Sequence, residues 1–265
     1  MKNKEEKEIL VNYHTHCDKC KHAGGKEEDY VRKAIENGFD ILGMSDHIPY
    51  PDGDFGCRME YSQLNPYLDE LTRLKEIYSD KIQLLRGFES EFLPQYSSYY
   101  ESLLKDERCD YLILGQHFFS LDNGDIKYVY DCDDTKWYIE YAKKAVEAMR
   151  TGYIKMLCHP DLIGVGNFKI SKDHLTAFDI IVEGAVKYDF ILEYNANGLR
   201  REIKDFGGEK RKDYPITQLW EMIENSGAKV ICGADSHSPD ALYDDIMKEG
   251  IKFLNNGKFN VKLYI

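Results

Sequence analysis

The sequence predicts an α/β fold, a distorted TIM-like (β/α)7 barrel whose strands and helices alternate along the chain. Short apolar, β-branched segments alternate with longer amphipathic segments throughout the 265 residues. This alternation implies parallel strands joined by helical crossovers. The length is usual for one barrel, and seven strand–helix units of this size favour closure of the sheet. We therefore expect a single domain over residues 1–265.

The segments follow one another in βαβ order. Strands are expected at residues 9–13, 40–45, 81–89, 110–118, 154–158, 190–196 and 229–234. Helices are expected at residues 27–38, 64–79, 134–152, 175–189, 215–227 and 238–250. Glycine closes several of these helices, at Gly38, Gly152 and Gly227, and Ser238-Pro239 opens the last. The tail 251–265 is left without an assigned strand.

Composition narrows the class of function. A formal net charge of −12 and a pI near 5.2 oppose binding to nucleic acid, which depends on Lys and Arg. The opening MKNKEEKEIL lacks the apolar core of a signal peptide, and no run approaches the roughly 20 apolar residues of a membrane span. Seven cysteines form an odd, scattered set that argues against a disulfide framework. We expect a cytoplasmic protein that acts on a small molecule.

Histidines mark the ends of the predicted strands. Seven of the eight histidines lie at or just beyond such an end. His14 and His16 are two residues apart after the first strand, so both imidazoles should point the same way. An HxH pair alone is as often two ordinary histidines, but other strands also end in ligand types. The further candidates are His47, Glu89, His117, His159, Asp235 and His237.

These side chains should meet, because the active site of a parallel barrel forms where the carboxyl ends of its strands converge. Imidazole and carboxylate ligands without obligatory thiolate suit Zn, Mn or Fe. The set exceeds the three or four ligands that one catalytic ion takes. The sequence therefore predicts a site for two or three divalent ions at this end of the barrel.

The motifs that carry these residues resemble those of the PHP-domain phosphoesterases, over essentially the whole chain. They are HTH at 14–16, SDH at 45–47, GFE at 87–89, GQH at 115–117, CHPD at 158–161 and GADSH at 233–237. The segments HTHCDKCKHAGG, SDHIPY and EYNANGLR resemble the histidinol-phosphate phosphatase type within this family. The resemblance implies hydrolysis of L-histidinol phosphate to L-histidinol and phosphate, in histidine biosynthesis, by attack of a metal-bound hydroxide.

The resemblance also implies how three ions would share the ligands. The first ion would take His14, His16, Glu89 and Asp235; the second Glu89, His117 and His159; the third His22, His47 and His237. Glu89 would bridge the first two ions. Glu91 is its rival on the same strand face, but the family pattern G-x-E selects Glu89.

Four further residues are candidates for catalysis and substrate binding. Asp46 and Asp161 flank His47 and His159 and are expected to orient these imidazoles or to protonate the leaving alkoxide. Arg200 is the expected phosphate clamp from the pattern NxxGxR, with Arg58 of GCRME as a second choice.

Two other features receive no role in this prediction. His174 falls at a predicted helix start rather than at a strand end, so we expect it to be packed or solvated. Cys17 and Cys20 form a single C-x-x-C, which alone is weak support for a redox pair or a structural zinc site.

Three other functions stay open from the residues alone. A PHP phosphatase for phosphotyrosine, a nucleotide or a sugar phosphate would share the same metal ligands. A metal hydrolase of the amidohydrolase type also has HxH after its first strand. A metal-binding structural or interaction module without activity is the third, although all nine expected ligand positions hold competent side chains.

Overall fold

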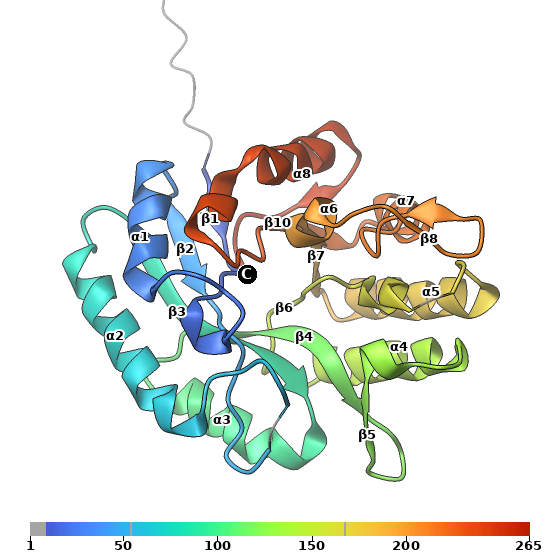
Figure 1. The fold of residues 1–265 in the computed structure, drawn as a ribbon, viewed down its shortest axis with the longest axis horizontal. Helices are drawn as coiled ribbons and strands as arrows, with labels where there is room; N and C mark the ends of the chain where they lie inside the picture. Colours follow the sequence, from blue (N-terminus) through green and yellow to red (C-terminus); the bar gives the residue numbers. More distant parts are fainter. Residues whose placement is uncertain (1–8, 54, 167) are drawn as a thin grey trace, which may run out of the picture.

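The computed structural model describes residues 9–53, 55–166 and 168–265 (Figure 1). Its main sheet has eight parallel strands in chain order, curled with the helices on the outside. The strands are β1 (Val11–Asn12), β2 (Ile41–Met44), β3 (Gln83–Phe92), β4 (Tyr111–Ser120), β6 (Met156–Leu157), β7 (Ile191–Asn195), β10 (Lys229–Gly233) and β11 (Asn260–Val261). The predicted α/β barrel-like class is confirmed, with each predicted strand present.

Helices follow the strands around the outside of the sheet (Figure 1). They are α1 (Glu27–Glu36), α2 (Leu64–Ile77), α3 (Ser97–Lys105), α4 (Lys136–Met149), α5 (Lys172–Lys187), α6 (Ala196–Arg200), α7 (Thr217–Ser226) and α8 (Asp245–Asn256). The short strand β5 (Ile126–Tyr128) pairs antiparallel with β4. Strands β8 (Lys204–Asp205) and β9 (Lys210–Arg211) form a separate two-stranded sheet. In the described part of the chain, no helix has the length and apolar character needed to cross a bilayer.

The structure adds elements that the sequence pattern did not predict. Helix α3 occupies the connection between the third and fourth strands, and β11 forms in the tail. β11 has only two residues. Phe259, Val261 and Leu263 alternate with polar residues around it, so the tail carries a short strand signal that the prediction does not include. β11 forms because β10 offers a free edge, with Lys229 and Val230 paired to Asn260 and Val261. The main sheet therefore has eight parallel strands rather than seven.

The curled sheet closes between β1 and β10 through a few separate contacts rather than through a continuous ladder of hydrogen bonds. Near the carboxyl ends of the strands, Thr15 and Ser236 form an isolated parallel bridge, and His16 N donates to Ser236 O at 3.0 Å. On the tail side, Tyr13 donates its hydroxyl proton to Leu263 O at 2.8 Å. The barrel is distorted because these short connections replace a continuous strand pair.

The core has an outer and an inner part. The outer part packs the helices on the sheet, and the inner part fills the barrel with Val11, Tyr13, Ile41, Tyr111, Ile113, Met156, Cys158, Ile191 and Ile231. Tyr111 crosses the interior and donates to Tyr13 O at 2.8 Å. A Cβ at Gly43 would lie 2.3 Å from the Tyr111 hydroxyl oxygen, so a larger residue there would displace the ring. This packed interior forms a floor beneath the open end of the barrel.

Candidate metal centre

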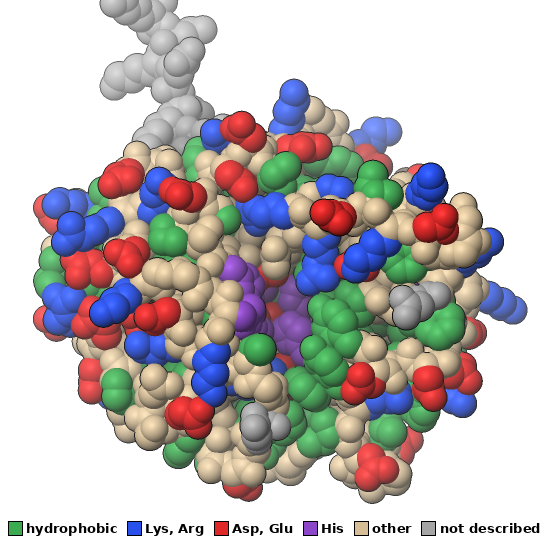
Figure 2. Space-filling view, viewed as in Figure 1, with side chains coloured by type: hydrophobic (Ala, Val, Ile, Leu, Met, Phe, Trp, Pro, Cys, Tyr) green, Lys and Arg blue, Asp and Glu red, His purple; other side chains and the backbone are tan. Residues whose placement is uncertain are grey.

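A cavity of about 540 Å³ opens at the carboxyl ends of the strands. In Figure 2 the histidine side chains lie at the bottom of a hollow in this face. The base includes His22, His47, Glu89, His117, His159, Asp235 and His237. The walls include the aromatic residues Phe55, Phe118, Tyr128, Tyr130 and Tyr214, together with Arg58 and Arg201. A polar, ligand-rich floor therefore lies beneath a largely aromatic wall.

The first group of ligand types forms around the HxH pair. His14 and His16 bring their Nε2 atoms to 3.1 Å of each other. Asp235 Oδ1 lies 3.5 Å from His14 Nε2 and 3.2 Å from His16 Nε2. Glu89 Oε2 lies 3.5 Å from both ring nitrogens. These four residues, far apart in the sequence, present donor atoms to one point.

Glu89 also reaches the second group with its other oxygen. Its Oε1 lies 3.0 Å from His159 Nε2 and 3.8 Å from His117 Nε2. The carboxylate thus stands between the two groups, with one oxygen toward each. Gly115 makes room for it, since a Cβ there would lie 2.5 Å from Glu89 Oε1.

The third group joins two distant loops. His22 Nε2 and His237 Nε2 are 2.8 Å apart, and a donor atom of His47 lies within 4.8 Å of theirs. His47 Nδ1 is also 2.9 Å from Glu89 Oε2, which links this group to the others. The structure therefore brings all nine ligand candidates together.

Carboxylates and carbonyls behind the centre fix the direction of several imidazoles. His14 Nδ1 donates to Glu193 Oε1 at 2.9 Å, and His16 Nδ1 lies 3.3 Å from Asp46 Oδ1. His22 and His237 donate from Nδ1 to the main-chain oxygens of Cys20 and Asp235, at 2.9 and 3.1 Å. A neutral ring that donates from Nδ1 presents a lone pair at Nε2.

The short distances between facing ring nitrogens indicate whether these residues can hold a metal ion. In the tautomers just described, the pairs His14–His16 and His22–His237 each direct two Nε2 lone pairs at one another, at 3.1 and 2.8 Å. Such pairs repel unless a cation or proton lies between them, and ionised carboxylates beside them favour a cation. The donor set therefore fits divalent ions that accept imidazole and carboxylate ligands.

The two carboxylates at the centre are held in their ionised form. Burial by itself would raise the pKa of Glu89, but His47, His117 and His14 hold this pKa well below its ordinary value. For Asp235 burial is again the largest influence, and the imidazoles of His14, His16 and His237 outweigh it and lower the pKa. Both side chains are therefore negative in the pH range where a metal would bind.

Glu193 is a functional candidate that the sequence analysis missed. It lies on β7, where no histidine marks the strand end, and it is fully buried. Besides His14, it accepts hydrogen bonds from His159 N at 3.0 Å and Asn195 Nδ2 at 2.8 Å. The available signal was a carboxylate inside the apolar strand FILEYN, since a buried carboxylate needs partners.

Glu91 contacts the Nδ1 side of His117, whereas Glu89 faces the Nε2 side of this ring, which agrees with the choice of Glu89. Glu91 forms a buried ion pair with Arg58, and its Oε1 lies 3.1 Å from His117 Nδ1. Its other oxygen accepts from Phe118 N at 3.0 Å. The carboxylate therefore orients His117 and anchors Arg58 in the cavity wall, where the guanidinium lies over Phe118.

The predicted roles of Asp46 and Asp161 need correction. Asp46 contacts the ring of His16 rather than that of His47, for which it accepts only the main-chain N–H. Asp161 accepts from Ile216 N at 2.6 Å and from Trp220 Nε1 at 3.1 Å, so it anchors the start of α7. Both carboxylates are buried behind the cavity floor, so neither is positioned to protonate a leaving group.

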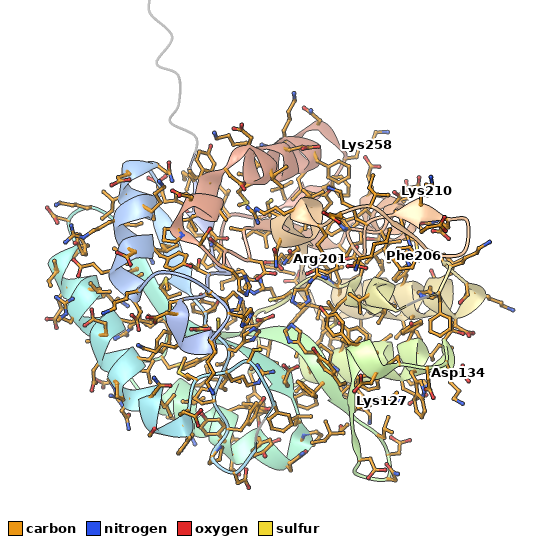
Figure 3. The ribbon with its side chains drawn as sticks, viewed as in Figure 1. Lys127, Asp134, Arg201, Phe206, Lys210 and Lys258 are labelled. Carbon is orange, nitrogen blue, oxygen red and sulfur yellow. The ribbon has the colours of Figure 1, made fainter. Side chains whose placement is uncertain are left out.

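The prediction that Arg200 binds the phosphate also needs correction. Its guanidinium donates to both oxygens of Asp244 and to the main-chain oxygens of Ala234 and Ala241, outside the cavity. The neighbouring Arg201 lines the cavity, and in Figure 3 it lies nearer the middle of the molecule than Lys210 or Lys258. Arg201 donates to Asp213 at 3.0 Å and lies over the ring of Tyr214.

His174 matches the packed alternative in the sequence analysis. It is buried at the start of α5, where its Nδ1 lies 2.9 Å from Ser171 Oγ in a capping box. Burial, with a smaller contribution from Arg211, lowers its pKa to about 4. His174 is therefore a neutral structural residue.

Comparison with known proteins places this chain in a family. Residues 12–197 match the PHP domain family. A probable histidinol-phosphatase of Deinococcus radiodurans is 26% identical over 250 residues, which cover 91% of this chain and 92% of the relative.

Two solved structures share the fold. A putative histidinol phosphatase of Listeria monocytogenes has a TM-score of 0.69 at 21% identity, covering 90% of this chain and 99% of its own. The histidinol phosphate phosphatase of Lactococcus lactis, complexed with zinc, L-histidinol and phosphate, has a TM-score of 0.66 at 17% identity. That match covers 92% of this chain and 91% of the other.

Proposed function

Because this chain belongs to the PHP domain family, we propose that it is a metal-dependent phosphatase that hydrolyses L-histidinol phosphate to L-histidinol and phosphate. The observation that carries the proposal is the convergence of nine imidazole and carboxylate side chains, seven of which line the base of one cavity. The relative and the solved structure named as histidinol phosphatases support the choice of substrate.

Two or three divalent ions would be held by the three groups described above. His14, His16, Glu89 and Asp235 would hold one ion, and Glu89, His117 and His159 a second. His22, His47 and His237 would hold the third. When bound, such ions lower the pKa of water toward neutrality and stabilise charge on phosphoryl oxygens.

The protein's own contribution is to keep these donors fixed before the substrate arrives. Glu193, Asp46 and Glu91 hold the rings of His14, His16 and His117 in one orientation. Preorganised groups need little rearrangement as charge develops during the reaction. Loss of an orienting carboxylate should therefore weaken both metal binding and catalysis.

Two guanidinium groups would bind the phosphate from the wall of the cavity. Arg201 replaces Arg200 in this role because it lines the cavity and Arg200 does not. Arg58 lies on the wall as well, held by Glu91, and its Nε has no hydrogen-bond partner among the described residues. A guanidinium can donate two parallel hydrogen bonds to phosphate oxygens.

The organic part of the substrate would lie against the aromatic wall. Phe55 comes from the loop after β2, Phe118 and Tyr128 from the segment that includes β4 and β5, and Tyr214 from the loop before α7. A planar imidazole ring can stack on such side chains, and its ammonium neighbour can lie over a ring face. The wall would also limit the access of water to the reacting phosphate.

The decisive experiment measures phosphate release from L-histidinol phosphate, p-nitrophenyl phosphate and phosphotyrosine. Metal-free protein is reconstituted separately with Mn²⁺, Zn²⁺ and Fe²⁺ before the assay. We expect a metal-dependent kcat/KM that is highest for L-histidinol phosphate. Equal activity on all three substrates would reject L-histidinol phosphate as the specific substrate, but it would still support a metal-dependent phosphatase. Inactivity with every metal would favour a binding module without catalysis.

A further inference from the structure

We propose that Cys20 is a thiolate ligand of the third ion, beside His22 and His237. The inference rests on the proposed metal-dependent function, but it concerns a residue outside the nine ligands considered so far. It makes this part of the centre a mixed nitrogen and sulfur site.

The position of Cys20 carries the proposal. It is the last residue of the short helix Asp18–Cys20 and is completely buried. Its sulfur and one ring nitrogen each of His16 and His237 lie within 4.8 Å of one another. Donor atoms at such mutual distances can share one ion, since Zn–S and Zn–N bonds are about 2.3 and 2.1 Å long.

The local backbone brings Cys20 and His22 to the same ion. Lys21, between them, has a left-handed φ of 69°, which reverses the chain direction after the short helix. His22 Nδ1 then donates to the main-chain oxygen of Cys20 at 2.9 Å, and His22 Nε2 meets His237 Nε2 at 2.8 Å. The sulfur of Cys20 shares a donor group with His237, and His237 is one member of the facing pair identified above.

Cys17 provides a matched contrast in the same loop. It is equally buried, but its sulfur donates to Asp46 Oδ2 at 3.1 Å. Its sulfur therefore contacts an orienting carboxylate. The sulfur of Cys20 instead donates to the main-chain oxygen of Cys17 at 3.2 Å and lies in a donor group with His16 and His237. The two cysteines of the C-x-x-C have different environments, and both are free thiols in the structure.

A thiolate changes the metal preference of the site. Sulfur ligands favour Zn²⁺, Fe²⁺ and Co²⁺ over Mn²⁺ and Mg²⁺, which prefer oxygen ligands. On binding, the Cys20 thiol would lose its proton to solvent and its sulfur would donate an electron pair to the ion, with no change in oxidation state. We therefore expect the third ion to be retained more tightly with zinc than with manganese.

The test uses Co²⁺ and needs no substrate. Metal-free full-length protein with Cys57→Ser, which removes the exposed cysteine, is titrated with Co²⁺ under reducing, oxygen-free conditions. Thiolate ligation gives a sulfur-to-cobalt charge-transfer absorption in the near ultraviolet. We expect this absorption in the parent and in Cys17→Ser, and its loss in Cys20→Ser.

Two further measurements separate ligation from misfolding. Cys20→Asp supplies an oxygen ligand, so this variant should still bind Co²⁺. The visible d–d absorption should report that binding, and the sulfur-to-cobalt absorption should be absent. Zinc bound at equilibrium should fall by one ion per chain in Cys20→Ser at limiting free zinc. The proposal is overturned if Co²⁺ binds the parent without the sulfur absorption, or if Cys20→Ser keeps that absorption in full.

Failure of this inference and failure of the proposed function can be told apart. A sulfur absorption that depends on Cys20, in a protein that hydrolyses none of the three phosphate esters, would support the ligand and reject the phosphatase. Full phosphatase activity without the sulfur absorption would support the phosphatase and reject Cys20 as a ligand.

Discussion

At the scale of single residues, some carboxylates of the centre are candidate metal ligands and others orient the imidazole rings. Glu89 and Glu91 are two residues apart on β3, yet Glu89 faces the ligand groups and Glu91 faces Arg58 and His117. Glu193 and Asp46 stand behind His14 and His16 in the same way. The directions of the His14, His16 and His117 rings are therefore set by carboxylates outside the ligand set, which makes these carboxylates sensitive to substitution.

Glu193→Gln should weaken metal binding while leaving the fold intact. The amide offers a donor where the carboxylate accepts from His14, His159 and Asn195, so the ring of His14 loses its fixed orientation. We expect affinity for the most strongly bound ion to fall about 10- to 100-fold. Zinc competition with a chelator measures this, with the exposed Glu221→Gln as control. Unchanged affinity would show that Glu193 does not act through His14.

Replacing the two neighbouring arginines should separate binding from stability. Arg201→Ala should lower kcat/KM about 10- to 100-fold, because it removes a charged hydrogen bond to phosphate worth about 1.5–3 kcal/mol. Arg200→Ala should instead lower the free energy of unfolding by about 1–3 kcal/mol, because Asp244 and two carbonyls lose their donor. Kinetics and urea unfolding of both variants give the comparison. The opposite pattern would restore Arg200 as the phosphate ligand.

At the scale of elements, the backbone just beyond two strand ends leaves the extended conformation at residues that are ligand candidates. His159 and Asp235 lie two residues beyond the ends of β6 and β10, and they have positive φ values of 32° and 44°. Non-glycine residues rarely adopt this region, and such strain is typical of functional sites. Both are ligand candidates, so the strained backbone aims their side chains at the cavity.

Gly115→Ala on β4 should disturb the centre through Glu89. The added methyl group would lie 2.5 Å from Glu89 Oε1 and 2.7 Å from a ring carbon of His117, so one of them must move. We expect a loss of metal affinity of at least tenfold, measured by chelator competition. Gly24→Ala is the matched control, because no atom lies within 4 Å of its added Cβ. Equal affinities in the two variants would contradict the close packing described for β4.

Helix α5 should make stability depend on pH through His174. Its pKa is about 4 in the folded protein and about 6.5 when unfolded, so the unfolded chain binds the proton more readily. The stability contributed by the neutral ring is present above pH 6.5 and is lost as the pH falls toward 4. His174→Gln keeps a capping residue but removes the titration. In urea unfolding with chelator, the wild type should lose more stability than the variant between pH 7 and 4.5; parallel curves would refute this.

At the scale of the whole molecule, the centre ties distant parts of the sheet together. Its candidate ligands follow or belong to β1, β2, β3, β4, β6 and β10, and the ring between β1 and β10 has only short connections. Ions bound there would link both sides of this gap. The fold and the metal centre should therefore be thermodynamically coupled.

Removal of metal should lower the thermal stability of the protein. A ligand at 100 times its Kd stabilises the folded state by about 2.7 kcal/mol per site, provided that it does not bind the unfolded chain. We expect chelation to reduce the melting temperature and Zn²⁺ to restore it in a concentration-dependent way, followed by calorimetry. The same scans with Glu89→Gln, which weakens the shared ligand, should show a smaller response. A melting temperature indifferent to chelation would argue against coupling.

The sequence by itself determined the alternation of strands and helices and the set of side chains that gather at one end. This succeeded because the carboxyl ends of parallel strands meet whatever the loops do, so residues as distant as His16 and His237 converge from topology alone. The sequence also kept His174 out of the ligand set as packed or solvated, and the structure shows that it is buried.

Only the tertiary structure decided which way individual side chains point. Arg200 and Arg201 are adjacent at the end of α6, where successive residues of a helix differ by about 100° in direction, so one faces Asp244 and the other the cavity. Asp161 finds Trp220, and Glu193 finds His14, across 59 and 179 residues. Such partners depend on the packing of distant segments, which local sequence patterns do not encode; β11 likewise exists because β10 presents an edge for it.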